Sequence, residues 1–191
     1  MQLNTVNFPV PVPNVGGFLD PQKIVGDLGV TQGMRISDFG SGAGHFTILL
    51  AKMIGDSGVM TAIDLMDSAL ETLRSKAIQE GLDNIQTVRS NLEAIGGSGL
   101  ANESQDLILI ATSLFQNQHK DAIIEEAKRV LKPGGSLVII EWRKGALGFG
   151  PPDELRTTPE EMQQMVLTKG FQLAREIDAG AFHYGFIFRK V

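Results

Sequence analysis

The 191-residue sequence contains no cysteine and only one tryptophan and one tyrosine. Without cysteine there can be no disulfide bond, no cysteine-based zinc site and no thiol nucleophile. The composition is compatible with the cytoplasm, where we expect the protein to be. No apolar run approaches the roughly 20 residues of a membrane-spanning helix. Residues 1–8 contain no lysine, no arginine and no apolar core segment, so we expect no signal peptide.

Positive charge is also scarce. Lysine and arginine number 17 against 22 aspartates and glutamates, which gives a net charge of −5. The basic residues occur in scattered pairs, without the stripe of basic and aromatic residues that is typical of proteins holding nucleic acid through its phosphates. The composition therefore argues against nucleic acid as a partner. The three histidines lie far apart and form no metal-ligand pair, so no metal site is expected.

The sequence does contain a glycine-rich loop between a predicted strand and a predicted helix. The glycines at alternate positions are Gly40, Gly42 and Gly44. Such spacing lets the backbone approach a ligand where a Cβ would collide, and the helix that follows offers free N–H groups to an anionic group. A second strand, over 59–63, is followed by Asp64, whose carboxylate can accept hydrogen bonds from ribose hydroxyls. This arrangement is typical of the nucleoside-binding half of a doubly wound sheet.

Strand and helix patterns alternate along the rest of the chain. The strands are expected over 34–39, 59–63, 85–89, 106–111, 137–140, 171–177 and 184–189. A helix over 67–80 should end at Gly81, and a capping box at Thr158 should begin another helix. We expect Pro133-Gly134-Gly135 to separate a helix from the fifth strand. The last two strands are joined by a short turn and should pair antiparallel.

The N-terminal segment has its own pattern. Prolines at alternate positions predict an extended arm over residues 1–17. Asp20 and Pro21 look like the cap and first residue of a short helix. Phe18 and Leu19 could either cover a bound ligand or attach this helix to the core. The chain length is most simply that of one domain over residues 1–191.

The stretch Asp38-x-Gly40-x-Gly42-x-Gly44, followed by Asp64, resembles motif I of the class I S-adenosylmethionine-dependent methyltransferases. The run over 129–135, Arg-Val-Leu-Lys-Pro-Gly-Gly, is similar to one in small-molecule methyltransferases of the quinone-biosynthesis group. Alternatively, the glycine loop is a turn of another kind of α/β protein, and Pro133-Gly134-Gly135 is a generic turn from a helix to a strand. The resemblance covers about residues 16–191. It implies an α/β, doubly wound, seven-stranded and mostly parallel sheet with an antiparallel last strand, the Rossmann-like methyltransferase fold.

This resemblance also implies S-adenosylmethionine as cofactor and assigns roles to residues. Asp64 would hold the ribose, and Asp38 would hydrogen-bond the glycine loop or the cofactor's amino group. Asn91 stands where the family commonly has Asp and could accept from the adenine amine; alternatively it satisfies its own backbone in a turn. The residues expected to bind the cofactor are Asp38, Gly40, Ser41, Gly42, Gly44, Asp64, Leu65, Met66, Asn91, Leu92 and Ala111.

The acceptor side is less defined by the sequence. Methyl transfer is an in-line displacement in which positioning can supply ~7–11 kcal/mol, so a catalytic residue need not be visible. A general base is needed only for a protonated nucleophile, and His45 and Glu141 are the candidates. The substrate pocket is expected to include Phe18, Phe115 and Trp142, with Gln116 as a further candidate.

We therefore expect a methyltransferase acting on a small molecule. Residues 111–114 lack the Asn/Asp-Pro-Pro-aromatic motif of amino-methylating DNA enzymes. The absence of cysteine also excludes a covalent cytosine-C5 mechanism and a thiolate arsenic site. Three alternatives stay open: a catalytically inactive cofactor-binding or interaction protein of this fold, a protein or RNA methyltransferase, and a nicotinamide-dependent oxidoreductase. Acceptor identity and oligomeric state are not encoded in any pattern found here.

Overall fold

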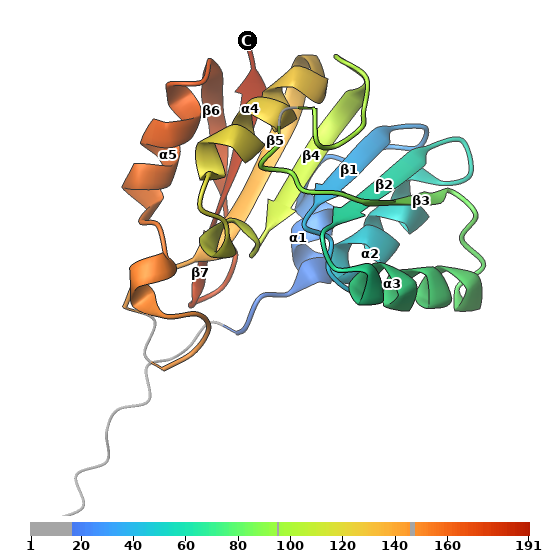
Figure 1. The fold of residues 1–191 in the computed structure, drawn as a ribbon, viewed down its shortest axis with the longest axis horizontal. Helices are drawn as coiled ribbons and strands as arrows, with labels where there is room; N and C mark the ends of the chain where they lie inside the picture. The colour runs from blue at the N-terminus through green and yellow to red at the C-terminus, as the bar shows by residue number, and fades with distance from the viewer. Residues whose placement is uncertain (1–16, 95, 146–147) are drawn as a thin grey trace, which may run out of the picture.

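The computed structural model describes residues 17–94, 96–145 and 148–191 (Figure 1). The predicted arm therefore lies, except for Gly17, outside the described residues. The strands are β1 (Arg35–Phe39), β2 (Val59–Asp64), β3 (Ile85–Arg89), β4 (Gln105–Ala111), β5 (Leu131–Trp142), β6 (Phe171–Ile177) and β7 (His183–Lys190). The helices are α1 (Pro21–Asp27), α2 (His45–Ile54), α3 (Asp67–Gln79), α4 (Lys120–Val130) and α5 (Pro159–Leu167), with short 3-10 helices η1 (Leu114–Gln116) and η2 (Asp153–Leu155).

The strands form one seven-stranded sheet in the order β3-β2-β1-β4-β5-β7-β6. β1 to β5 pair in parallel, whereas β7 runs antiparallel to both β5 and β6. The predicted fold class is confirmed, including the reversed strand at the end of the chain. Because β2 and β4 flank β1, the strand order reverses direction at β1, and open α/β sheets bind ligands at such a point.

The helices cover both faces of the sheet. α4 and α5 lie on one face and α1, α2 and α3 on the other (Figure 1). Each face has its own apolar core. One contains Ile124 of α4 and Met162 of α5, and the other contains Ile24 of α1 and Leu50 of α2. The central strands are buried on both sides, which explains why the last five residues of β4 are all apolar.

Local signals set most of the element boundaries. The Asp20 side chain accepts hydrogen bonds from two backbone N–H groups of α1, with Pro21 at the first helical position. Thr158 and Glu161 form the predicted capping box of α5. Gly81 follows α3 with a φ of +65°, as expected for a left-handed residue after a helix. None of the helices within the described ranges is long and apolar enough to cross a bilayer.

One predicted boundary was wrong. Pro133-Gly134-Gly135 was expected to precede the fifth strand, but β5 begins at Leu131, directly after α4. Leu131 already pairs with Gln105 of β4, and regular pairing resumes between Ser136 and Leu107. The three residues therefore lie in an irregularity inside the strand, which the φ of +73° at Gly134 permits.

Candidate functional site

The carboxyl ends of β1, β2 and β4 meet where the strand order reverses, and cavities open there. The larger has a volume of about 530 Å³ and the smaller about 250 Å³. Small-molecule sites typically measure ~300–1,000 Å³, so the pair is large enough for a nucleoside-sized ligand. Both cavities are lined by Gly40, Asp64, Met66 and Gln116. The shared residues make the cavities adjoining parts of one site.

Asp38 is the buried acid of the larger cavity. The residue is central in the sheet, paired with Ala62 on one side and Leu109 on the other. Its carboxylate accepts one side-chain hydrogen bond, from Thr47 Oγ1 at 2.7 Å. Burial raises the pKa of Asp38 to about 7; the Thr47 hydrogen bond opposes this shift and the negative charge of Asp64 adds to it. A cationic ligand group beside it would stabilise the ionised form.

Asp64 ties the end of β2 to the glycine loop. Its Oδ2 accepts from the backbone N–H of Gly42 and its Oδ1 from that of Met66, both at 2.8 Å. Each carboxylate oxygen has two lone pairs, so both can still accept from a ligand hydroxyl. Asp64 therefore holds the glycine loop in shape and also faces the cavity. The sequence predicted a role toward a ligand but not the contact with the loop.

The three loop glycines have different tasks. A Cβ on Gly40 would lie 2.6 Å from Cβ of Ser113, so the loop packs directly against the segment after β4. A Cβ on Gly42 would meet nothing within 4 Å, and this residue lines the larger cavity. At Gly44, a Cβ would lie 2.3 Å from Cδ1 of Leu73. Gly44 is not among the residues that line the two cavities, and it lets α3 pack against the start of α2; a cofactor contact of Gly44 stays a prediction.

The smaller cavity has an apolar rim. Leu65 and Met66 line it although they are 61% and 63% exposed. Asn91 and Leu92 line it from the segment after β3. Asn91 Oδ1 accepts from the backbone N–H of Glu93 at 3.0 Å, which is the turn interaction left open as an alternative role. The exposed apolar side chains fit a flat, apolar ligand group such as a base.

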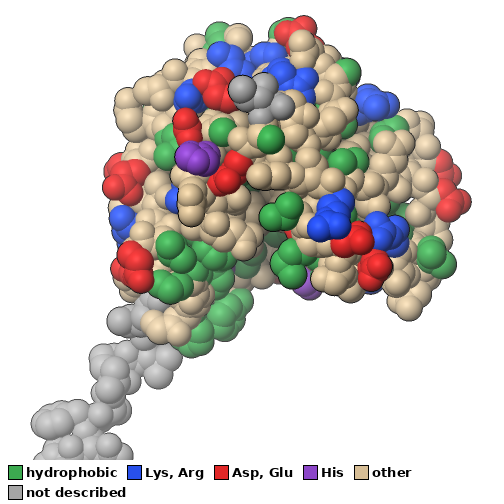
Figure 2. Space-filling model, in the orientation of Figure 1, with side chains coloured by type: hydrophobic (Ala, Val, Ile, Leu, Met, Phe, Trp, Pro, Cys, Tyr) green, Lys and Arg blue, Asp and Glu red, His purple; other side chains and the backbone are tan. Residues whose placement is uncertain are grey.

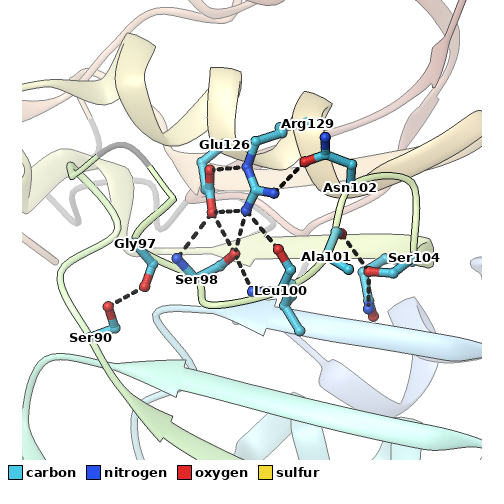
Figure 3. Close-up of polar contacts among 10 residues, drawn as sticks. Ser90, Gly97, Ser98, Leu100, Ala101, Asn102, Ser104, Glu126 and Arg129 are labelled. Carbon is cyan, nitrogen blue, oxygen red and sulfur yellow. Dashed lines mark hydrogen bonds and ion pairs between the residues drawn. The ribbon is translucent and has the colours of Figure 1, made fainter.

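An ion pair between buried Glu126 and partly buried Arg129 holds the segment between β3 and β4 against α4 (Figure 3). Glu126 accepts from the backbone N–H of Ser98 at 3.0 Å and pairs with Arg129 at 2.7 Å. Arg129 also donates to the carbonyl of Leu100 at 2.8 Å. These hydrogen bonds lower the pKa of Glu126 to about 2 in spite of its burial, which opposes them. The segment that carries Asn91 is thereby anchored at its far end.

The predicted substrate residues do not line either cavity. Trp142 stacks on His183, with ring centroids 4.0 Å apart, and lies under the guanidinium of Arg156. Phe18 packs against Phe149 and Phe182, with centroids 5.6 and 5.1 Å away. In the view of Figure 2, hydrophobic side chains gather at the lower edge of the molecule, on the side of the loop before α5.

Phe115 is half-buried in η1 and also lies outside the residues that line the two cavities. A substrate role for Phe18, Phe115 and Trp142 stays a prediction. Gln116, by contrast, lines both cavities.

The two candidate catalytic residues lie in different surroundings. His45 is exposed at the first turn of α2 and lines the larger cavity. Glu141 is only 2% exposed and lines neither cavity. Its carboxylate accepts from the backbone N–H of Leu114 at 2.7 Å. His45 can thus reach a bound ligand, whereas Glu141 faces the segment behind the cavities; a catalytic role for either stays a prediction.

Sequence reasoning missed part of the cavity lining. The missed residues of the larger cavity are Pro21, Ala43, Phe46, Ala69 and Thr112, whereas Leu19, which was expected either to cover a ligand or to attach α1 to the core, also lines it. In the smaller cavity they are Phe39, Ser90, Ser113, Asn117 and Ile123. Most are apolar or small and carry no chemical signature. Ser90, Thr112 and Ser113 could have been indicated by their position directly after a parallel strand.

Observations at the site fit S-adenosylmethionine. Ser41 Oγ is buried at the larger cavity without a hydrogen-bond partner among the described residues. A buried hydroxyl without a partner costs free energy that a polar ligand atom would recover. Asp38 and Asp64 suit an ammonium group and ribose hydroxyls, and Leu65 and Met66 suit an adenine ring. Predicted residues from all three strand ends therefore converge on one site.

Comparison with known proteins gave consistent results. The family model of a methyltransferase domain matches residues 30–183. A ubiquinone/menaquinone biosynthesis C-methyltransferase, UbiE, of Shewanella halifaxensis is 37% identical over 117 residues. That alignment covers 61% of this chain and 45% of the relative, so the matched part is less than half of the relative's length.

Solved structures show the same fold. A SAM-dependent methyltransferase from Aquifex aeolicus superposes with a TM-score of 0.83 and 29% identity, covering 91% of each chain. The [4+2]-cyclase SpnF superposes with a TM-score of 0.75 over 88% of this chain and 79% of its own, at 18% identity. The second likeness concerns the fold alone, and it illustrates that one fold carries different chemistries.

Proposed function

This chain belongs to the methyltransferase domain family, and we propose that it transfers a methyl group from S-adenosylmethionine to a small-molecule acceptor. The observation that carries the proposal is the convergence of Asp38, the glycine loop and Asp64 on a cavity of about 530 Å³ at the strand reversal point. The match of residues 30–183 to the family supports it. We also propose that the protein is located in the cytoplasm, as expected from the sequence.

Each of the two cavities would hold a different part of the cofactor. Asp64 would hold the ribose and Asp38 the amino group, with the backbone of Gly40, Ser41, Gly42 and Ala111 around the amino-acid end. Leu65 and Met66 would enclose the adenine, with Asn91 and the backbone N–H of Leu92 at its edge. When bound, the cofactor supplies a methyl group on a sulfonium. The protein then has to orient the acceptor and exclude water.

No proton transfer has to be assigned for this reaction class. A general base is required only where the acceptor atom is protonated, and His45 is the exposed titratable side chain on the larger cavity that could serve. A small acceptor agrees with the quinone-biosynthesis name of the Shewanella relative, although the alignment covers only 45% of that protein. That the acceptor is a small molecule is therefore part of the proposal.

The first experiment is a binding comparison. Calorimetry should detect S-adenosylmethionine and its demethylated product, S-adenosylhomocysteine, but not nicotinamide dinucleotides. Tight binding of a nicotinamide dinucleotide without S-adenosylmethionine binding would overturn the proposal.

The second experiment identifies the acceptor. The protein is incubated with methyl-labelled S-adenosylmethionine and a cell extract divided into small-molecule, protein and RNA fractions. Label should appear in the small-molecule fraction. Label in protein or RNA instead would assign a macromolecular acceptor, and cofactor binding without label in any fraction would favour a non-catalytic protein of this fold.

A further inference from the structure

At the end of β5, on the face covered by α4 and α5, a glutamate is buried without a cation. Glu141 is 2% exposed, and none of the ion pairs of the described residues includes it. Its neighbour across the sheet is Tyr184 of β7, whose hydroxyl donates to the carbonyl of Thr157 and not to Glu141. The carboxylate is thus satisfied by the backbone alone.

Glu141 accepts from two backbone N–H groups, one of which belongs to residues 112–117, the segment that follows β4. Oε1 accepts from the backbone N–H of Leu114 at 2.7 Å, and Oε2 from that of Trp142 at 3.3 Å. We call residues 112–117 the β4–η1 segment.

The β4–η1 segment forms a wall of both cavities. Thr112 and Gln116 line the larger one, and Ser113, Gln116 and Asn117 line the smaller one. Ser113 Oγ donates to the carbonyl of Phe39 at 3.1 Å, and Ser113 leaves no room for a Cβ on Gly40. The segment therefore packs directly against the start of the glycine loop and is one of its supports.

The conformation of the segment requires an external restraint. Thr112 has a φ of +50°, a left-handed conformation that is unfavourable for a β-branched residue. Such a residue persists only where its surroundings hold it. The restraints are the hydrogen bond from the Thr112 N–H to the carbonyl of Ile140 at 2.8 Å and the carboxylate of Glu141.

Stability alone does not explain a glutamate at this position. Burial raises the pKa of Glu141 to about 7, and the surrounding N–H groups only partly offset this. The folded protein therefore binds the proton more strongly than the unfolded chain, so ionisation of this group at pH 8 lowers the free energy of unfolding. Removing a carboxylate from water costs free energy, so the charge of Glu141 is not a source of stability.

We propose that Glu141 is a positioning residue, whose carboxylate holds the β4–η1 segment in the shape that the cofactor cavities require. The inference rests on the proposed function for its effect on the cofactor, but the effect on the segment itself is independent of that function. This role would also link the end of β5, which carries Trp142, to the wall of the cofactor site.

The test is Glu141→Gln at pH 8, where the wild-type carboxyl is mostly ionised. The amide keeps one acceptor for the Leu114 N–H but loses the charge. We expect the dissociation constant of S-adenosylhomocysteine to rise about threefold to tenfold, because couplings carried by neighbouring packed groups are of this size. Amide hydrogen exchange should accelerate within residues 112–117, whereas the melting temperature should stay within about 3 °C of wild type.

The matched control is Asp106→Asn. Asp106 also accepts a backbone N–H, that of Arg35 at 2.8 Å, but it lies at the opposite end of the same strands. This variant should leave affinity and exchange in residues 112–117 unchanged.

Unchanged affinity in Glu141→Gln would overturn the proposal, as would weaker affinity without faster exchange in the β4–η1 segment. If wild type does not bind S-adenosylhomocysteine, the proposed function fails, and the exchange measurement still decides whether Glu141 holds the segment.

Discussion

Removal of the Asp64 carboxylate tests two roles of this side chain, namely holding the glycine loop and, as proposed above, binding the ribose. Asp64→Ala deletes the acceptors for the N–H groups of Gly42 and Met66, each 2.8 Å away, and the acceptor proposed for the ribose. Asp64→Asn keeps the size of the side chain, but its amide nitrogen must face one of these two N–H groups. Because two donors then oppose each other, the Asn variant should resemble the Ala variant more than wild type.

The magnitudes follow from hydrogen bonds to a charged acceptor. Such bonds contribute roughly 1.5–3 kcal/mol each when desolvated, and Asp64 is only partly buried, so we expect a stability loss of about 2 kcal/mol in total. For a chain of this size that corresponds to a decrease in melting temperature of roughly 4–8 °C. Loss of the ribose contact should raise the dissociation constant of S-adenosylhomocysteine roughly tenfold to a hundredfold.

Calorimetric titration and thermal melting measure the two effects on the same sample. Asp67→Ala is the control, because Asp67 carries the same charge nearby but is exposed, and within the described part of the chain its ion-pair partner is Arg74, at 3.4 Å. Its affinity should stay within about twofold of wild type. A folded Asp64→Ala protein that binds with wild-type affinity would refute the ribose role, and an unchanged melting temperature would refute the loop role.

Further predictions concern Asp38 and the segment before α1. Because burial raises the pKa of Asp38 to about 7, the ionised fraction increases about tenfold between pH 6 and 8, and affinity for S-adenosylhomocysteine should increase accordingly. Asp38→Asn should flatten this part of the profile in calorimetry at both pH values; an equal slope in both proteins would exclude Asp38. Phe18→Ala should lower the melting temperature by roughly 2–4 °C and leave affinity unchanged, since Phe18 packs on Phe149 and Phe182. Leu19→Ala should weaken cofactor binding, because Leu19 lines the larger cavity. Weaker binding in Phe18→Ala at an unchanged melting temperature would instead support Phe18 as a cover of the site.

Much of the fold could be predicted from local patterns. Apolar periodicity, the capping box at Thr158 and Gly81 after α3 depend on residues a few positions apart, and all are found in the structure. The boundary at Pro133 could not be predicted in the same way. It depends on pairing between Leu131 and Gln105, which are distant in sequence.

The sequence by itself determined the cofactor side of the site, since the glycine loop and Asp64 belong to a single strand–helix–strand unit whose geometry follows from its spacing. Only the tertiary structure decided which neighbours close the site. The pairing of β4 with β5 brings Glu141 against the β4–η1 segment, and the chain between η2 and α5 places Arg156 over Trp142. The packing of α3 against the start of α2 likewise brings Leu73 against Gly44. Contacts between such distant segments depend on strand order and side-chain direction, and no spacing along the chain encodes either of them.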